Sequence, residues 1–88
     1  LYSANLVEAS LRDADLSEAY LFETNLDRSD LVRSNLQTAI LVEATFREAN
    51  LSEANLSGAD LSKAIITKKQ LRSCASYKGA KLDPELLE

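Results

Sequence analysis

Leucine recurs at every fifth position through residues 1–66, with Phe46 and Ile66 as the only substitutes. A small residue, most often alanine, stands two positions before each of these hydrophobic centres. Asparagine or aspartate lies between the two in eight repeats, at Asn5, Asp15, Asn25, Asp30, Asn35, Asn50, Asn55 and Asp60. Such an internal repeat determines the architecture before local helix or strand propensity does.

A period of five fits neither a helix nor a continuous strand. Five residues advance an α-helix by about 140° beyond a full turn, so the leucines would wind around every side of it. In a strand, an odd period sends successive leucines to opposite faces. A bend in every repeat resolves the conflict, because the leucine and the small residue can then both point inward. If each bend is near a right angle, four repeats close one coil, and coils can stack at the strand spacing of about 4.8 Å.

The motif A-(D/N)-L-x-x, seen at Ala4-Asn5-Leu6 and again at Ala14-Asp15-Leu16, resembles the pentapeptide-repeat proteins. The resemblance covers residues 1–66. It implies an all-β fold, a right-handed quadrilateral β-solenoid of about three coils with the leucines stacked inside. It also implies a bacterial and especially a cyanobacterial setting.

The residues that follow the last repeat predict a helical cap. Thr67 is a good N-cap residue, and Gln70 three positions later completes a capping box. Gly79 is expected to end this segment. We therefore divide the chain into a solenoid at residues 1–66 and a capping helix and tail at residues 67–88, which would cover the open edge of the last coil.

Two details of the cap carry separate expectations. Ala80-Lys81-Leu82 resembles one more repeat in a shifted register. Cys74 is expected to be a small apolar residue on the helix face, and as the single cysteine it excludes an internal disulfide.

Charge is distributed unevenly along the chain. Residues 1–62 hold eleven acidic and four basic side chains, a net charge of −7, whereas residues 63–88 hold six basic and three acidic ones, a net charge of +3. An acidic body argues against direct nucleic-acid binding, which requires cations to neutralise phosphates. If four repeats make one coil, Glu8 stacks on Arg28 and Asp13 on Arg33, which favours the stack.

Outward positions become apolar on one side of the predicted solenoid. Tyr2, Phe22 and Val42 share one column, and Tyr20 and Ile40 share the column beside it. Contiguous exposed apolar surface commonly marks a contact site, so these five residues form the candidate protein-contact patch. Two alternatives stay open: aromatic stacking that only supports the solenoid, and burial of the patch under the C-terminal tail.

The composition argues against catalysis and against cofactor or metal binding. The chain has no histidine to activate a nucleophile, and its two glycines do not form a phosphate-binding loop. We therefore expect no enzyme activity, no cofactor, no metal and no small-molecule substrate. No apolar run approaches the roughly 20 residues of a membrane span, so no membrane partner is expected either.

The prediction for function is a non-enzymatic interaction scaffold that binds a protein partner or associates with itself. The family resemblance implies one alternative, mimicry of DNA by an acidic rod that binds a type II topoisomerase. A second alternative is a structural spacer from a longer chain, since the sequence begins at a repeat centre rather than at methionine. The cytoplasm is favoured as the compartment, with the thylakoid lumen and the periplasm as alternatives.

Overall fold

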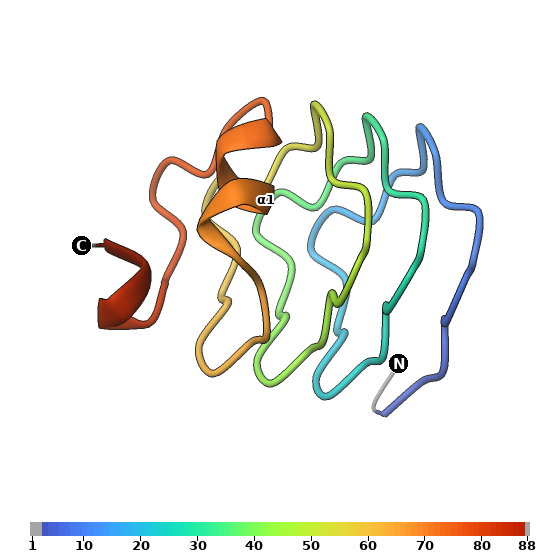
Figure 1. Cartoon of the computed structure of the whole chain (residues 1–88), viewed down its shortest axis with the longest axis horizontal. Helices are drawn as coiled ribbons and strands as arrows, with labels where there is room; N and C mark the ends of the chain where they lie inside the picture. Colours follow the sequence, from blue (N-terminus) through green and yellow to red (C-terminus); the bar gives the residue numbers. More distant parts are fainter. Residues whose placement is uncertain (1–2, 88) are drawn as a thin grey trace.

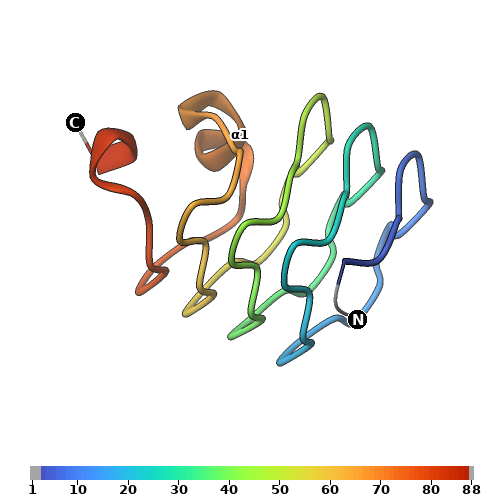
Figure 2. The ribbon, with the colours of Figure 1, turned by 90° about the horizontal axis from the view of Figure 1, so that it is seen from below.

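The chain winds into coils that stack one after another along the long axis of the molecule (Figures 1 and 2). The computed structural model describes residues 3–87, so Leu1, Tyr2 and Glu88 lie outside the described part. Isolated parallel bridges join each residue to the equivalent one four repeats later, for example Asn5 to Asn25 and Asn25 to Thr45. The predicted coil of four repeats is therefore confirmed. The right-handed sense of the winding stays a prediction from the family resemblance.

Backbone hydrogen bonds between consecutive coils hold the stack together. The N–H of Leu6 donates to the carbonyl oxygen of Asn25 at 2.8 Å, and the N–H of Glu8 donates to that of Asp27 at 3.0 Å. In the opposite direction, the N–H of Asn25 donates to the carbonyl oxygen of Ala4 at 2.9 Å. The same pattern recurs through the stack, so three of the five N–H groups in a typical repeat pair with a neighbouring coil.

The remaining two N–H groups of a repeat are satisfied within it. The N–H of Ala9 donates to the carbonyl oxygen of Leu6 at 3.1 Å and closes a β-turn. The N–H of Val7 donates to the side-chain oxygen of Asn5 at 3.1 Å. All eight Asn and Asp residues of the repeat motif make this second bond. Asn or Asp is therefore preferred at this position because its side-chain oxygen accepts a hydrogen bond from a backbone N–H group that pairs with no neighbouring coil.

Each turn places its third residue in the left-handed region of backbone conformation. Glu8 has φ 62° and Thr38 has φ 57°, and twelve non-glycine residues of the described part have positive φ. Positive φ at the third turn position alone is the type II pattern, which favours glycine. Only Gly58 and Gly79 meet this preference. Because the left-handed region costs an L-residue on the order of 1 kcal/mol, the inter-coil hydrogen bonds have to outweigh that strain.

The interior is a stack of leucines with alanines between them. Leu21, Leu26, Leu31 and Leu36 are fully buried, and Phe46 fits the same interior with 0% exposure. Full burial of such a side chain stabilises by roughly 1.5–3 kcal/mol. Leucines of the first coil are only partly buried because no described coil covers them.

A short helix, α1 (Lys68–Ser73), follows the last full coil and confirms the predicted capping box. The backbone N–H of Gln70 donates to the Thr67 hydroxyl, and the Thr67 N–H donates to the Gln70 side-chain oxygen. The Gln70 amide nitrogen also donates to the carbonyl oxygens of Phe46 at 2.6 Å and Ala49 at 3.0 Å. One side chain thus caps the helix and closes part of the coil edge beneath it.

The helix is shorter than the sequence predicted, and Gly79 does not end it. The helix stops at Ser73, with Cys74 as its C-cap in an extended conformation. Cys74 therefore caps the helix and does not lie on a helix face. Gly79 instead takes the positive-φ position of a further turn, with φ 76°. The reason is the stacking of Ala75, whose N–H donates to the Ala54 carbonyl oxygen at 2.8 Å and so draws the chain back into a coil.

Stacking continues past residue 66, inside the segment assigned to the cap. Asn55 bridges Ser76, and Asp60 bridges Lys81, so this coil is one residue longer than those before it. This confirms the extra repeat in a shifted register, because α1 adds one residue to the coil. A short 3₁₀ helix, η1 (Pro84–Leu87), then leads away from the last coil at the end of the molecule (Figure 1).

Acid should weaken the stack through the aspartates that serve as turn acceptors. The hydroxyl and the N–H of Ser17 lower the pKa of Asp15, and those of Ser62 lower the pKa of Asp60 against the opposing effect of burial. Since these pKa values lie below the unfolded value of about 3.9, their stabilisation is present above that value and is lost as pH falls through the folded values. In urea unfolding, we expect a free energy of unfolding that is flat from pH 7 to about pH 5 and falls at lower pH.

The matched control is the double variant Asp15→Asn with Asp60→Asn, because asparagine supplies the same side-chain oxygen without titrating. Its loss of stability in acid should be smaller than that of the unmodified chain. An identical loss in both proteins would contradict the assignment.

The cap can be tested with Gln70→Glu. Glutamate keeps the acceptor of the capping box but replaces the amide that donates to Phe46 and Ala49 with a second oxygen. Two carbonyl oxygens then lose their donor and face a carboxylate, so we expect the free energy of unfolding to fall by about 2 kcal/mol in urea titrations at pH 7. Lys69→Gln is the control for altered charge in the same helix. Equal stability of Gln70→Glu and the unmodified chain would show that these bonds contribute nothing.

Candidate interaction surface

Four of the five predicted contact residues lie together on one side of the coils. We call Tyr20, Phe22, Ile40 and Val42 the side patch; the fifth residue, Tyr2, lies outside the described residues. Tyr20 is 61% exposed, the largest exposure among the described aromatic side chains, and the other three are partly exposed. The structure therefore brings these four residues to the surface as neighbours.

The side patch follows from the stacking of two repeats in register. Tyr20 bridges Ile40, and the N–H of Leu21 donates to the Ile40 carbonyl oxygen at 2.8 Å. The N–H of Glu23 donates to the Val42 carbonyl oxygen at 2.9 Å, which aligns the neighbouring column. Tyr20 and Ile40 occupy the position that holds Asn or Asp in eight other repeats, so these two repeats have apolar surface in place of the turn acceptor.

Polar residues bound the patch on the next coil. Ile40 bridges Asp60, and the Ser62 hydroxyl donates to the Asp60 carboxylate at 2.6 Å. The C-terminal tail does not cover the patch: η1 lies beyond the last coil, at the opposite end of the stack from residues 20–22 (Figures 1 and 2). The alternative that the C-terminal tail buries the side patch is therefore wrong.

Charged columns on other sides carry ion pairs as predicted. The Arg33 guanidinium donates to the Asp13 carboxylate at 2.7 Å, and this hydrogen bond lowers the pKa of Asp13. Arg28 lies 3.4 Å from Glu8 in the neighbouring column. All four side chains are at least 47% exposed, so the pairs align the coils but add little stability.

Sequence reasoning missed a second surface, a pocket at the C-terminal end of the stack. It has a volume of about 640 Å³ and is lined by Leu71, Arg72, Cys74, Ala75, Ser76, Tyr77, Lys78, Gly79, Ala80, Leu82 and Leu87. We call it the end pocket. The available signal was Tyr77, which takes the place of an interior leucine in the extra coil and is 41% exposed. Burial raises the pKa of the Cys74 thiol to about 11, so this thiol is protonated at neutral pH.

Two further kinds of site were sought among the described residues, a metal-ligand cluster and a membrane-spanning helix. Within residues 3–87, no three His, Cys, Asp or Glu side chains gather as metal ligands. No helix among them is long and apolar enough to cross a membrane.

Comparison with known proteins agrees with the repeat geometry. A family model described as pentapeptide repeats matches eight copies, at residues 1–37 and 29–67. The chain belongs to the pentapeptide-repeat family. Comparison with curated proteins returns no match.

Two solved cyanobacterial pentapeptide-repeat proteins resemble this one along nearly all of its length. Rfr23 from Cyanothece 51142 is 37% identical over 96% of this chain and 53% of its own, with a TM-score of 0.73. HetL from Nostoc sp. strain PCC 7120, described as involved in heterocyst differentiation regulation, is 31% identical over 94% of this chain and 35% of its own, also with a TM-score of 0.73. This pentapeptide-repeat chain thus spans about half of one relative and about a third of the other.

The variant Ile40→Asn tests whether the fold depends on an apolar residue at this position of the side patch. This variant restores the turn acceptor of the repeat, here for the N–H of Val42, and removes one partly exposed apolar side chain. The gained hydrogen bond, worth about 1 kcal/mol, should offset the lost apolar burial. We expect a melting temperature equal to or above that of the unmodified chain. A marked fall would show that Ile40 is needed for stacking itself.

Proposed function

We propose that this pentapeptide-repeat protein is a non-enzymatic interaction module and that the side patch is its contact site for a protein. The observation that carries the proposal is the exposure of Tyr20 at a position where most repeats place Asn or Asp. Aromatic side chains are enriched in interface cores because they bury large area with few rotatable bonds. The rigid stack would present the patch without a cost in backbone ordering.

The relatives support a role in binding rather than in chemistry. HetL is described as involved in the regulation of differentiation, and regulation through contact with another protein accords with a scaffold of this kind. The patch of this chain extends over two coils, which suits a small or transient contact more than an obligate one.

Mimicry of DNA finds less support in the charges. The molecule extends 30 Å along its longest axis, over which duplex DNA would carry about 18 charges. Residues 1–62 hold eleven acidic side chains, and four of these pair with arginines. A continuous anionic face is therefore absent from the described coils. A spacer without a partner is the remaining alternative.

The test compares the unmodified chain with the double variant Tyr20→Asn and Ile40→Asn. Both substitutions restore the residue type of the repeat, so the variant should fold with the same circular dichroism spectrum and melting temperature. We expect it to lose self-association in sedimentation velocity, or to lose the proteins that the immobilised unmodified chain retains. The expected loss is at least tenfold, because truncating a central interface aromatic often costs about 2 kcal/mol.

Ile65→Ser serves as the matched control. Ile65 occupies the same position of its repeat and is 45% exposed, but it lies outside the side patch. If the double variant associates as the unmodified chain does, or if the control loses association equally, the side patch is not a contact site and the spacer alternative is favoured.

A further inference from the structure

Two glutamates stack on each other along one border of the side patch. Glu23 follows Phe22 in one coil, and Glu43 follows Val42 at the equivalent position of the next coil. The N–H of Glu23 donates to the Val42 carbonyl oxygen at 2.9 Å, which holds the two positions in register. Both glutamate side chains are exposed. Like charges directly opposite one another on neighbouring strands lower stability, so the packing of the coils does not explain this pair.

On two other sides of the stack, the same turn position alternates in charge from coil to coil. One column holds Glu8, Arg28 and Glu48, and another holds Asp13, Arg33 and Glu53. The four basic side chains of residues 3–62 all form ion pairs, and Glu23 and Glu43 belong to none of these pairs. The Ser3 hydroxyl donates to the Glu23 carboxylate at 3.1 Å, which leaves its charge in place. Within the described residues, this border of the patch therefore carries negative charge that no ion pair neutralises.

A polar hollow adjoins the opposite border of the patch. It has a volume of about 330 Å³ and is lined by Ser17, Glu18, Asn35, Gln37 and Thr38. Glu18 stands two residues before Tyr20, so the hollow ends at the corner that leads onto the patch. No Lys or Arg lines the hollow, and Glu18 forms no ion pair among the described residues. The hollow therefore offers a carboxylate to one long cationic side chain.

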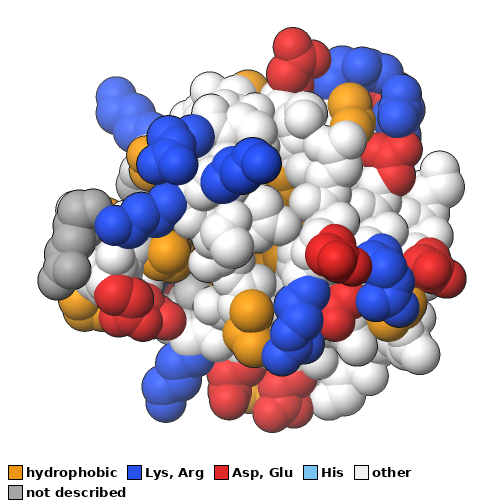
Figure 3. All heavy atoms as spheres, viewed as in Figure 1, with side chains coloured by type: hydrophobic (Ala, Val, Ile, Leu, Met, Phe, Trp, Pro, Cys, Tyr) orange, Lys and Arg blue, Asp and Glu red, His pale blue; other side chains and the backbone are white. Residues whose placement is uncertain are grey.

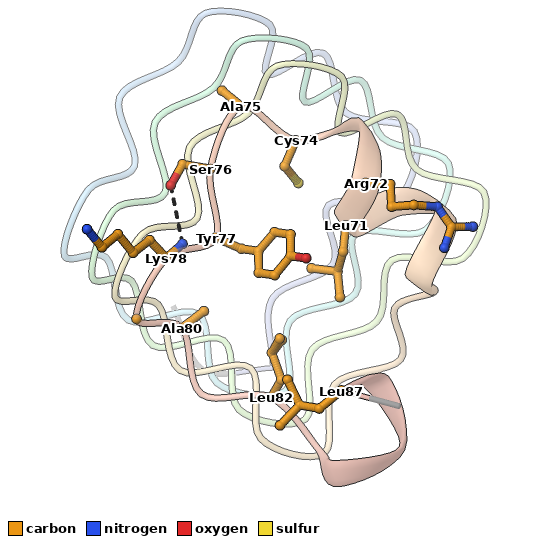
Figure 4. A pocket seen from close by; sticks show the side chains of 11 residues that line it. Leu71, Arg72, Cys74, Ala75, Ser76, Tyr77, Lys78, Ala80, Leu82 and Leu87 are labelled. Atoms are coloured by element: carbon orange, nitrogen blue, oxygen red, sulfur yellow. Dashed lines mark hydrogen bonds between the residues drawn. The ribbon is translucent and has the colours of Figure 1, made fainter.

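Most basic side chains of the chain lie toward its C-terminal end. Residues 63–88 hold six of the ten Lys and Arg residues, and on the face drawn in Figure 3 such side chains gather toward that end. In Figure 4, Arg72 and Lys78 lie on opposite sides of the end coil and point away from the end pocket. Lys63, on the coil after Glu43, forms no ion pair with it. Neutralisation of the acidic borders is thus left to another molecule.

A second copy of the chain does not supply the missing cations. Two copies that meet on the side patch are related by a two-fold axis that runs either across the stack or along it. An axis across the stack places Glu23 of one copy opposite Glu43 of the other. An axis along the stack places the border of Glu23 and Glu43 opposite the border of Glu18. Both arrangements bring carboxylates together, so the charges favour a different protein over self-association.

We propose that the partner of the side patch is a basic segment of another protein, in which Lys or Arg residues flank apolar ones. This inference rests on the proposed function, because it concerns the same surface. The apolar residues of the segment pack on Ile40 and Val42. One flanking cation lies between Glu23 and Glu43, and another enters the hollow beside Glu18. The ring of Tyr20 can also receive a cation on its face.

The probe is a fluorescein-labelled peptide of sequence Arg-Lys-Leu-Phe-Lys-Arg, measured by fluorescence anisotropy. Arg-Lys-Ser-Ser-Lys-Arg removes its apolar residues, and Glu-Glu-Leu-Phe-Glu-Glu reverses its charge. We expect the first peptide to bind with a Kd on the order of 100 μM and each of the other two to bind at least about fivefold more weakly. Rising salt should weaken the first peptide, because salt screens exposed charges.

The acidic border is tested with the double variant Glu23→Gln and Glu43→Gln. It should bind the first peptide about fivefold more weakly and with a smaller dependence on salt, since exposed ion pairs are partly screened. Its melting temperature should equal or exceed that of the unmodified chain, because a stacked pair of like charges is removed. Glu48→Gln with Glu53→Gln is the matched control, with the same loss of charge at the same turn position on other sides. This control should bind the peptide as the unmodified chain does.

Location is tested by the amide resonances of the ¹⁵N-labelled chain. The first peptide should shift resonances of residues 20–23 and 40–43 and leave those of residues 50–53 in place. The variant Tyr20→Asn with Ile40→Asn should also lose binding, since the apolar contacts and the charges act together.

Four outcomes would overturn the proposal: no binding at about 1 mM peptide, equal binding of the three peptides, equal weakening in the two glutamate variants, or binding that survives Tyr20→Asn with Ile40→Asn. The proposed function fails separately. If Tyr20→Asn with Ile40→Asn abolishes association and Glu23→Gln with Glu43→Gln leaves it unchanged, the side patch remains a contact site and its partner is not basic.

Discussion

The hydrogen bond from one coil to the next, repeated every four pentapeptides, is the constraint on which the rest of the structure depends. Three of the five N–H groups in a typical repeat point along the stack, and they can be satisfied only if successive coils keep the same register. Register in turn places leucine on leucine in the interior. An insertion or deletion between residues 5 and 65 would therefore disturb the hydrogen bonds and the core together.

This constraint explains features that look unfavourable locally. Twelve non-glycine residues of the described part accept positive φ, and in ten of them the N–H group, as at Glu8, donates to a carbonyl oxygen of the following coil. In eight repeats, the Asn or Asp before the central residue accepts a hydrogen bond from the N–H group that stacking leaves unpaired. Local strain and local polarity are both consequences of a bond made to the neighbouring coil.

The same constraint decides where function can reside. Inward positions are fixed by packing, so variation is confined to the outward positions and to the ends of the stack. At the side patch, Tyr20 and Ile40 exchange a turn acceptor for apolar surface. At the C-terminal end, Gln70 closes part of the coil edge with one amide.

The sequence by itself determined the coil length, the inward leucines, the capping box at Thr67 and Gln70, and the grouping of Tyr20 with Ile40, because all of these depend on spacing alone. It also indicated the extra repeat at Ala80-Lys81-Leu82. Only the tertiary structure decided that the helix ends at Ser73, that Gly79 serves a turn, and that the tail lies at the end of the stack and away from the side patch. The helix ends at Ser73 because Ala75 stacks on Ala54 of the preceding coil, and a longer helix would break that contact. Local helix propensity cannot predict this end, since the contact is made with a residue far away in the sequence. The end pocket has the same origin, since it exists only because α1 and the tail cover one side of the final coil and not the other.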